Sequence, residues 1–251
     1  MNRVALLRIA YPLLGLLILL AVWHFYIILF HVPEVVMPTP LQVADALMQN
    51  WQALVSESGA TLLECLYGFA LAVAAGILIA VLISTFDVLN QIFYPILIAT
   101  QSVPKVAIAP VILIWFGVGM ESKVAIAFVV AFFPMVIDTA TGLRSTSREM
   151  LDLARVLNCS PLQTFWKIQL PSALPFIFSG AKVAVTLAVV GAVIGEFVGS
   201  SSGLGNLLLA ASAQVEVPLV WASLVFLSAI GMLLFAGVAL AERLLMPWAP
   251  G

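Results

Sequence analysis

The sequence contains few charged residues, and this shortage excludes most classes of soluble protein. Only 9% of the 251 residues are Asp, Glu, Lys or Arg, while 63% are hydrophobic, and the mean hydropathy is +1.18. Because a soluble domain is roughly a quarter charged, these residues cannot cover a surface that faces water. The ten Lys and Arg residues form no basic stripe, so nothing in the sequence indicates nucleic-acid binding.

Residues that serve metal, redox or phosphate chemistry are also scarce. The two cysteines, Cys65 and Cys159, lie far apart in apolar or helical patterns, so we expect packing residues rather than a disulfide or a zinc site. The two histidines, His24 and His31, form no HExxH motif, and no GxxxxGK[ST] loop is present to hold phosphate. We therefore expect no metal site, no cofactor and no ATP site in this chain.

Long uncharged runs are abundant instead, and they predict an all-α membrane protein with one transmembrane domain over residues 1–251. A bilayer core about 30 Å thick requires roughly 20 apolar residues in a helix. The expected spans are residues 9–30, 61–84, 88–116, 123–143, 175–198 and 217–241. We expect Pro104 and Pro110 to break the third span. The first span follows Arg3 and Arg8 and is longer than the apolar part of a signal peptide, so we interpret it as a retained anchor.

The positions of Lys and Arg predict that both termini lie in the cytoplasm. The segments then placed inside contain Arg3, Arg8, Arg144, Arg148, Arg155, Lys167 and Arg243. The segments then placed outside, 31–59 and 199–216, contain no Lys or Arg. Within the first of these, Pro38-Thr39-Pro40 precedes residues 41–50, which form either a short amphipathic helix at the outer membrane surface or a plain connector.

The inner segment 144–171 carries more charge than the rest of the chain and predicts two short helices. Thr146 with Glu149 is typical of a capping box, and Asn158 suits the left-handed residue that ends a helix near Leu157. A second capping box follows, with Ser160 as N-cap, Pro161 in the first turn and Gln163.

The second helix of this segment carries apolar side chains and is expected to end at Pro171. Its apolar residues are Leu162, Phe165, Trp166 and Ile168. Either the two helices lie on the membrane surface as an ordinary loop, or they fill a groove on a soluble partner. The capping and the mixed charges favour the partner.

This segment resembles the EAA loop of permeases in binding-protein-dependent ABC importers. The resemblance rests on DLARVLNCS (residues 152–160), Phe165 and LPSALP (residues 170–175). Asp152 replaces the Glu of the family pattern, Leu153 an Ala, and Asn158 a Gly. The first change keeps the charge and the third keeps the tolerance for a left-handed backbone.

Further segments resemble the nitrate/sulfonate/taurine-type subfamily of these permeases. They are Pro38-Thr39-Pro40, Val103-Pro104-Lys105-Val106-Ala107, Trp115-Phe116-Gly117 and Ser202-Gly203-Leu204-Gly205. The resemblance implies a type I importer fold and a homodimer of permeases in a bacterial cytoplasmic membrane. It also implies two ATPase subunits, which hold ATP and Mg, and an external substrate-binding protein. The implied coupling residues are Asp152, Leu153, Ala154, Arg155, Asn158, Phe165, Leu170 and Pro171.

Ionisable and helix-breaking residues inside spans are costly, so each one is a candidate for the solute pathway. The candidates are Pro104, Lys105, Pro110, Asp138 and Glu196. Alternatively, Lys105 pairs with Glu121 and stabilises the fold, Asp138 reaches the cytoplasmic boundary, and Glu196 anchors a loop or is solvated at the interface. Glu64 and Lys182 lie near span ends and are expected to extend to the membrane surface.

Small residues recur at every fourth position in two spans and predict close contact between helices. They are Gly68, Ala72, Gly76 and Ala80 in the second span, and Gly191, Gly195 and Gly199 in the fifth. Packing within one subunit is favoured over a dimer contact that slides during gating.

Three functions are compatible with a multi-span membrane protein. The first is ATP-driven import by alternating access, for an organic anion, nitrate or a pyrimidine-type heterocycle. The second is an ion-coupled carrier or channel, which would require paired acids deep in several spans. The third is a membrane hydrolase, for which His24 is a poor base. The resemblance of the 144–171 segment favours import.

Overall fold

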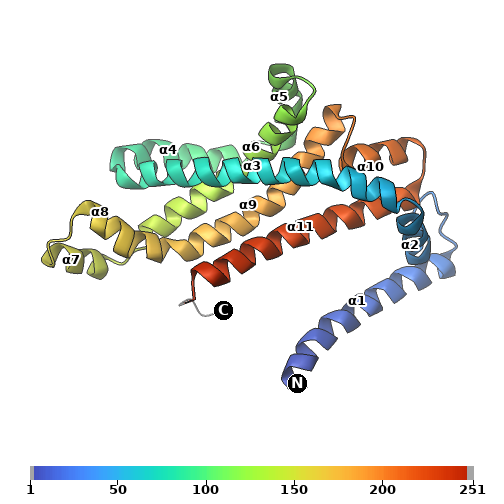
Figure 1. Ribbon diagram of the computed structural model, residues 1–251, viewed down its shortest axis with the longest axis horizontal. Coiled ribbons are helices and arrows are strands. Elements are labelled where there is room, and N and C mark those ends of the chain that lie inside the picture. Colours follow the sequence, from blue (N-terminus) through green and yellow to red (C-terminus); the bar gives the residue numbers. More distant parts are fainter. Residues whose placement is uncertain (1–2, 248–251) are drawn as a thin grey trace.

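The uncharged runs form long helices in the computed structural model, which describes the backbone of residues 3–247 and the side chains of residues 10–247 (Figure 1). Within the described residues, five single helices are long and apolar enough to span a membrane: α1 (Arg3–Phe30), α3 (Trp51–Thr85), α6 (Met120–Arg144), α9 (Leu170–Gly199) and α11 (Val217–Leu245). Counted as one bent span, α4 (Asp87–Gln101), the 3-10 turn η1 (Lys105–Ile108) and α5 (Ala109–Phe116) make a sixth. The prediction of an all-α membrane protein with about six spans is confirmed.

Shorter elements lie at the two ends of this helical array. The helices α2 (Pro40–Gln49) and α10 (Leu204–Ala213) lie at one end, and α7 (Arg148–Val156) and α8 (Pro161–Thr164) lie at the other (Figure 1). The predicted helix after Pro38-Thr39-Pro40 is therefore present, and Thr39 caps it together with Gln42. The side chains of Arg3 and Arg8, which contribute to the orientation prediction, lie outside the described side chains.

The third span is bent more sharply than the sequence predicts. Its two halves meet at 93°, and the break covers Ser102 to Pro104. Pro104 caps the 3-10 turn, as expected of a residue without a backbone donor. The prediction that Pro110 also breaks the helix is wrong, because Pro110 lies in the first turn of α5, where its missing N–H costs no hydrogen bond.

Two further helix boundaries differ from the prediction. α3 begins at Trp51 rather than near residue 61, because the polar residues of its first three turns hide that part of the helix from a search for apolar runs. Pro171 does not end a helix, because α8 continues through a π-helical turn (Phe165–Gln169) into α9. The wider turn shifts the hydrogen-bond register, so Pro171 falls in the first turn of α9 and needs no donor.

The small residues of α3 and α9 bring both helices against α6. A Cβ atom on Gly68 would lie 2.5 Å from the Ala127 side chain, and one on Gly191 would lie 2.6 Å from the Ala127 Cα. Ala72 and Ala80 are fully buried in the same row. The prediction that these residues pack helices within one subunit is confirmed, and α6 is the central helix.

We expect Gly191→Ala to destabilise the protein, because the added methyl group overlaps the backbone of α6. Overpacking of this kind costs about 1–3 kcal/mol of unfolding free energy. Gly231→Ala in α11 is the matched control, since a Cβ atom there meets nothing within 4 Å. Thermal unfolding in detergent measures the difference, and equal melting temperatures for the two variants would contradict the packing described here.

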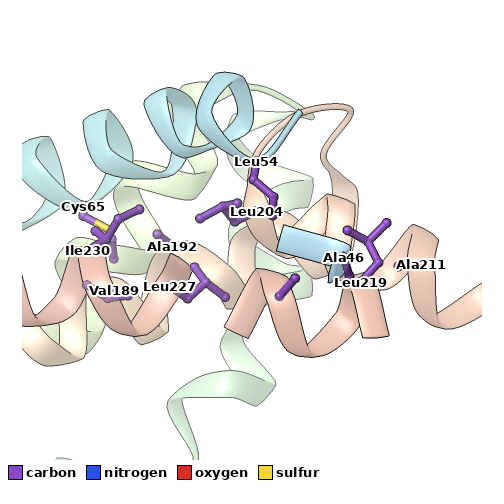
Figure 2. Packing of buried hydrophobic residues seen from close by; sticks show 12 residues of the cluster. Ala46, Leu54, Cys65, Val189, Ala192, Leu204, Ala211, Leu219, Leu227 and Ile230 are labelled. Carbon is purple, nitrogen blue, oxygen red and sulfur yellow. The ribbon is translucent and has the colours of Figure 1, made fainter. Parts of the chain in front are cut away.

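An apolar cluster joins α2, α3, α6, α9, α10 and α11 at the end of the molecule opposite α7 (Figures 1 and 2). Leu54 of α3 and Leu204 of α10 are fully buried in it, and Cys65 packs there as a free thiol, as predicted. α1 diverges from the other spans, and only 6% of its apolar window is buried within the chain. Its exposed apolar surface is consistent with contact to lipid.

Candidate functional site

The segment between α6 and α9 begins with a capped amphipathic helix, α7. Ser147 is its N-cap and accepts a hydrogen bond from the Met150 backbone. The prediction of Thr146 as the capping residue is therefore wrong by one position. Two neighbouring hydroxyl residues, Thr146 and Ser147, precede the helix, and the second has the extended backbone that a cap requires.

Asn158 ends α7 in the left-handed conformation that the sequence predicts. Its φ is +52°, and its N–H donates to the Arg155 carbonyl, while the Cys159 N–H donates to the Ala154 carbonyl. These two bonds form a Schellman motif, which satisfies the last free carbonyls of the helix. The bend between α7 and α8 is thus built by one residue with positive φ.

The outer face of α7 exposes apolar side chains next to charges. Leu153, Val156 and Leu157 are half or more exposed, although α7 lies beyond the ends of the long helices (Figure 1). Asp152 and Arg155 form an exposed ion pair at 2.7 Å on the same helix. Such a pair contributes little to stability in water, so these residues are available for contact with another molecule.

The second half of the segment anchors α7 to the spans. Ser160 and Gln163 form the predicted capping box of α8. Phe165 and Leu170 are partly buried against a core cluster of α6 and α9 that includes Leu143 and Ala173. The residues predicted to couple to a partner therefore divide into two sets. The first set is exposed and consists of Asp152, Leu153, Arg155 and Asn158. In the second set, Ala154 is buried, and the connection with α9 contains Phe165, Leu170 and Pro171.

The predicted pathway residues do not form one cluster. Pro104 and Lys105 lie at the bend of the third span, and the Lys105 ammonium is 5.7 Å from the ring centre of Phe133 on α6. Within residues 10–247, Lys105 makes no ion pair, so its pairing with Glu121 is not found. Asp138 lies farther along α6, where it packs against Gly180 of α9. Whether these residues contact solute stays a prediction.

Glu196 is buried inside the fold. Only 1% of the residue is exposed, and its carboxylate accepts hydrogen bonds from the Thr61 hydroxyl at 2.6 Å and from the Gly205 backbone. The interpretation as a solvated interface residue is wrong, and the contact with Gly205 is the one that anchors the loop between α9 and α10. A role of Glu196 in the solute pathway stays a prediction.

A buried ion pair, which the sequence did not lead us to predict, lies beside Glu196. Glu64 of α3 and Lys123 of α6 are 2.6 Å apart, with side chains only 2% and 7% exposed. Lys123 also donates to the Ser200 hydroxyl at 2.8 Å, and Glu57 accepts from the Gly203 backbone. The expectation that Glu64 extends to the membrane surface is therefore wrong, because it has a partner inside the protein.

The spacing of residues on α3 could have indicated this network. Glu57, Thr61 and Glu64 lie four and three positions apart, so they share one helix face. A row of polar side chains on one face of a span is expected to face protein rather than lipid. Lys182 has a partner too, since its ammonium contacts Glu242 of α11.

No metal centre is found in the part of the chain that the structure describes. Within it, no group of three or more His, Cys, Asp or Glu side chains is placed to hold a metal ion. The described residues instead place an exposed apolar helix pair at one end of the molecule and a buried polar network near the other.

A family model described as "Binding-protein-dependent transport system inner membrane component" matches residues 72–247. The chain is 34% identical to the formylaminopyrimidine transport permease protein ThiX of Halalkalibacterium halodurans, over 94% of this chain and 95% of that protein. It is 36% identical to the riboflavin transport system permease protein RibX of Chloroflexus aurantiacus, over 97% and 93%. The putative aliphatic sulfonates transport permease protein SsuC of Bacillus subtilis is 30% identical, over 92% and 84%.

The fold resembles that of a chain in the inward-facing MetNI methionine ABC transporter. The two align with a TM-score of 0.65 at 20% identity, over 77% of this chain and 96% of the other. At this level of identity the comparison concerns the fold alone. It agrees with the type I importer fold that the sequence resemblance implies.

Proposed function

Because this chain belongs to the family of binding-protein-dependent transport system inner membrane components, we propose that it forms the solute pathway of an ABC importer as one copy of a permease homodimer. Two ATPase subunits bind ATP and Mg and supply the energy, and an external binding protein delivers the solute. The chain itself carries out no covalent chemistry in this proposal.

The observation that carries this proposal is the exposed, capped helix α7 beyond the ends of the spans. Its exposed apolar residues lie next to Asp152 and Arg155, and Asn158 ends the helix. A short amphipathic helix of this kind suits a groove on a soluble partner. The continuous helix from Pro161 to Gly199 would transmit a displacement of the partner directly into a span.

The proposed orientation places α7 in the cytoplasm. This end of the molecule carries Arg144, Arg148, Arg155 and Lys167, and Arg243 lies near the end of α11. The opposite end, with α2 and α10, contains no Lys or Arg in residues 31–59 and 199–216. The positive-inside rule then puts both termini inside the cell and the turn after α9 outside.

We propose a pyrimidine-type heterocycle as the solute, with a small organic anion as the second candidate. The relatives named for formylaminopyrimidine and for riboflavin are 34% and 36% identical, against 30% for the sulfonate permease. Among the described residues, three acids around the outer network, the partly buried Glu57 and the buried Glu64 and Glu196, also outnumber its cation, Lys123. An excess of negative charge disfavours an anion.

Co-purification tests the proposed assembly. The tagged permease, expressed with the ATPase encoded beside its gene, is expected to retain that ATPase in equal amounts in detergent. A permease that elutes without it would contradict the proposal and favour the ion-coupled carrier.

Competition between solutes tests the proposed substrate. In proteoliposomes that contain the whole transporter, we expect excess unlabelled taurine to leave the uptake of labelled formylaminopyrimidine unchanged. Excess unlabelled formylaminopyrimidine serves as the control and is expected to abolish the labelled signal. Inhibition by taurine would instead support the organic anion.

A further inference from the structure

The start of α10 is attached to the spans by hydrogen bonds to side chains. The backbone N–H groups of residues 203–205 all donate to side chains of α3 or α9, and the acceptors are Glu57, Thr61 and Glu196. Because the first N–H groups of a helix have no partner within it, these side chains take the place of a cap, which Gly203 does not supply. The position of the turn between α9 and α10 therefore depends on these three acceptors.

Two of the acids at this end of the fold lie in contact with each other. The carboxyl groups of Glu64 and Glu196 are within hydrogen-bonding distance, and each residue is only 1% exposed. Two carboxyl groups at this distance cannot both be ionised, and such a pair shares one proton. Among the described residues, Lys123 is the only cation in contact with either acid, and it balances only one of them. The other acid therefore needs a proton.

The hydrogen-bond partners indicate which of the two acids is protonated. Glu64 Oε1 lies 2.6 Å from the Lys123 ammonium, so Glu64 is the ionised partner. Glu64 Oε2 is buried and accepts no hydrogen bond from an N–H or hydroxyl group of the described residues. A protonated Glu196 supplies the missing O–H donor, and its carboxyl group can still accept from Thr61 and Gly205. The proton thus satisfies a buried acceptor that otherwise has no donor.

We propose that Glu196 is a positioning residue that carries a proton in the folded permease and donates it to Glu64, and that this hydrogen bond fixes the turn before α10 to α3. The second acid can then lie in the interior without a second cation. Glu57 is only partly buried and keeps its charge, so this end of the molecule stays net negative. Its place at the outer membrane face rests on the proposed function, while the proton itself does not.

The groups that face Glu196 cannot compensate for the loss of this proton. α3 contributes Glu64 and the Cys65 thiol, and α6 contributes Lys123. The ammonium of Lys123 is already bonded to Glu64 and to the Ser200 hydroxyl. The described residues of α5, α10 and the turn before α10 contain no titratable side chain, and the other charges of α9 and α11 lie toward their inner ends. An ionised Glu196 would therefore face the Glu64 carboxylate directly and push the two apart.

Infrared spectroscopy of the full-length permease in detergent detects the proton directly. A protonated carboxyl group has a C=O stretching band at a frequency where a carboxylate has none. We expect the wild-type protein at neutral pH to show such a band, and Glu196→Gln to remove it. Glu216 is an exposed acid at the same end of the molecule, so Glu216→Gln is the matched control and should retain the band. Identical bands in wild type and Glu196→Gln would overturn the proposal.

Amide hydrogen exchange of residues 203–205 tests the positioning role. Glutamine keeps an N–H donor for Glu64 and a carbonyl acceptor for the Gly205 N–H, so Glu196→Gln should exchange like wild type. Glu196→Ala should exchange at least about tenfold faster, the loss of roughly one or two good hydrogen bonds. Equal exchange in all three proteins would overturn the positioning role, and Glu196→Gln exchanging as fast as Glu196→Ala would overturn the protonated form. Neither measurement uses ATP or solute, so both can be interpreted even if the proposed import function fails.

Discussion

Lys123→Met is expected to lower the free energy of unfolding by about 3–5 kcal/mol, since it leaves a buried carboxylate without its partner. Glu64 is 1% exposed, and Lys123 is the only cation in contact with it among the described side chains. The variant also removes the donor to Ser200 in the turn after α9. The yield of folded protein and its melting temperature in detergent measure the effect.

The double variant Glu64→Leu with Lys123→Met is the control for this prediction. An apolar pair of similar volume can replace a buried ion pair at little cost, so most of the lost stability should return. A single variant as stable as wild type would contradict the buried pair.

Asn158→Pro is expected to reduce ATP-driven uptake at least about tenfold while the spans stay folded. Proline cannot adopt a φ of +52° and removes the N–H that bonds to Arg155, and backbone strain of this kind costs of order 1–3 kcal/mol. The bend between α7 and α8 would then be lost, and α7 would no longer have the orientation that contact with the ATPase requires. Retention of the ATPase on the tagged permease is measured beside uptake.

Asn158→Gly distinguishes the backbone from the side chain. Glycine adopts positive φ without cost and keeps the N–H, and it is the residue of the family pattern that the sequence resembles. We therefore expect this variant to bind the ATPase and to transport like wild type. If Asn158→Pro did so as well, the bend would have no part in coupling.

The spans could be predicted because lipid imposes a simple requirement on composition. Runs of about 20 uncharged residues identify helices such as α6 and α11 within a few positions. The same criterion failed at Trp51–Ala60, where polar residues begin a helix that protein rather than lipid surrounds. The separate expectation that Pro171 ends a helix failed because a π turn accommodates a proline that a regular helix could not.

The structure of the segment between α6 and α9 could be predicted from local chemistry, while the buried network could not. Ser160, Gln163 and Asn158 act through backbone bonds within a few residues, so their roles follow from sequence order. Glu64 and Lys123 are brought together by the packing of α3 on α6, which no local pattern specifies. The sequence therefore predicted that Glu64 extends to the membrane surface and gave no partner for it.

The most direct test of the account is uptake of labelled formylaminopyrimidine into proteoliposomes. These contain the permease with the ATPase encoded beside it, and the binding protein is added outside. We predict uptake that requires ATP inside and the binding protein outside, and that ceases when the ATPase is omitted. Uptake by the permease alone, driven by an ion gradient, would contradict the central claim and identify an ion-coupled carrier.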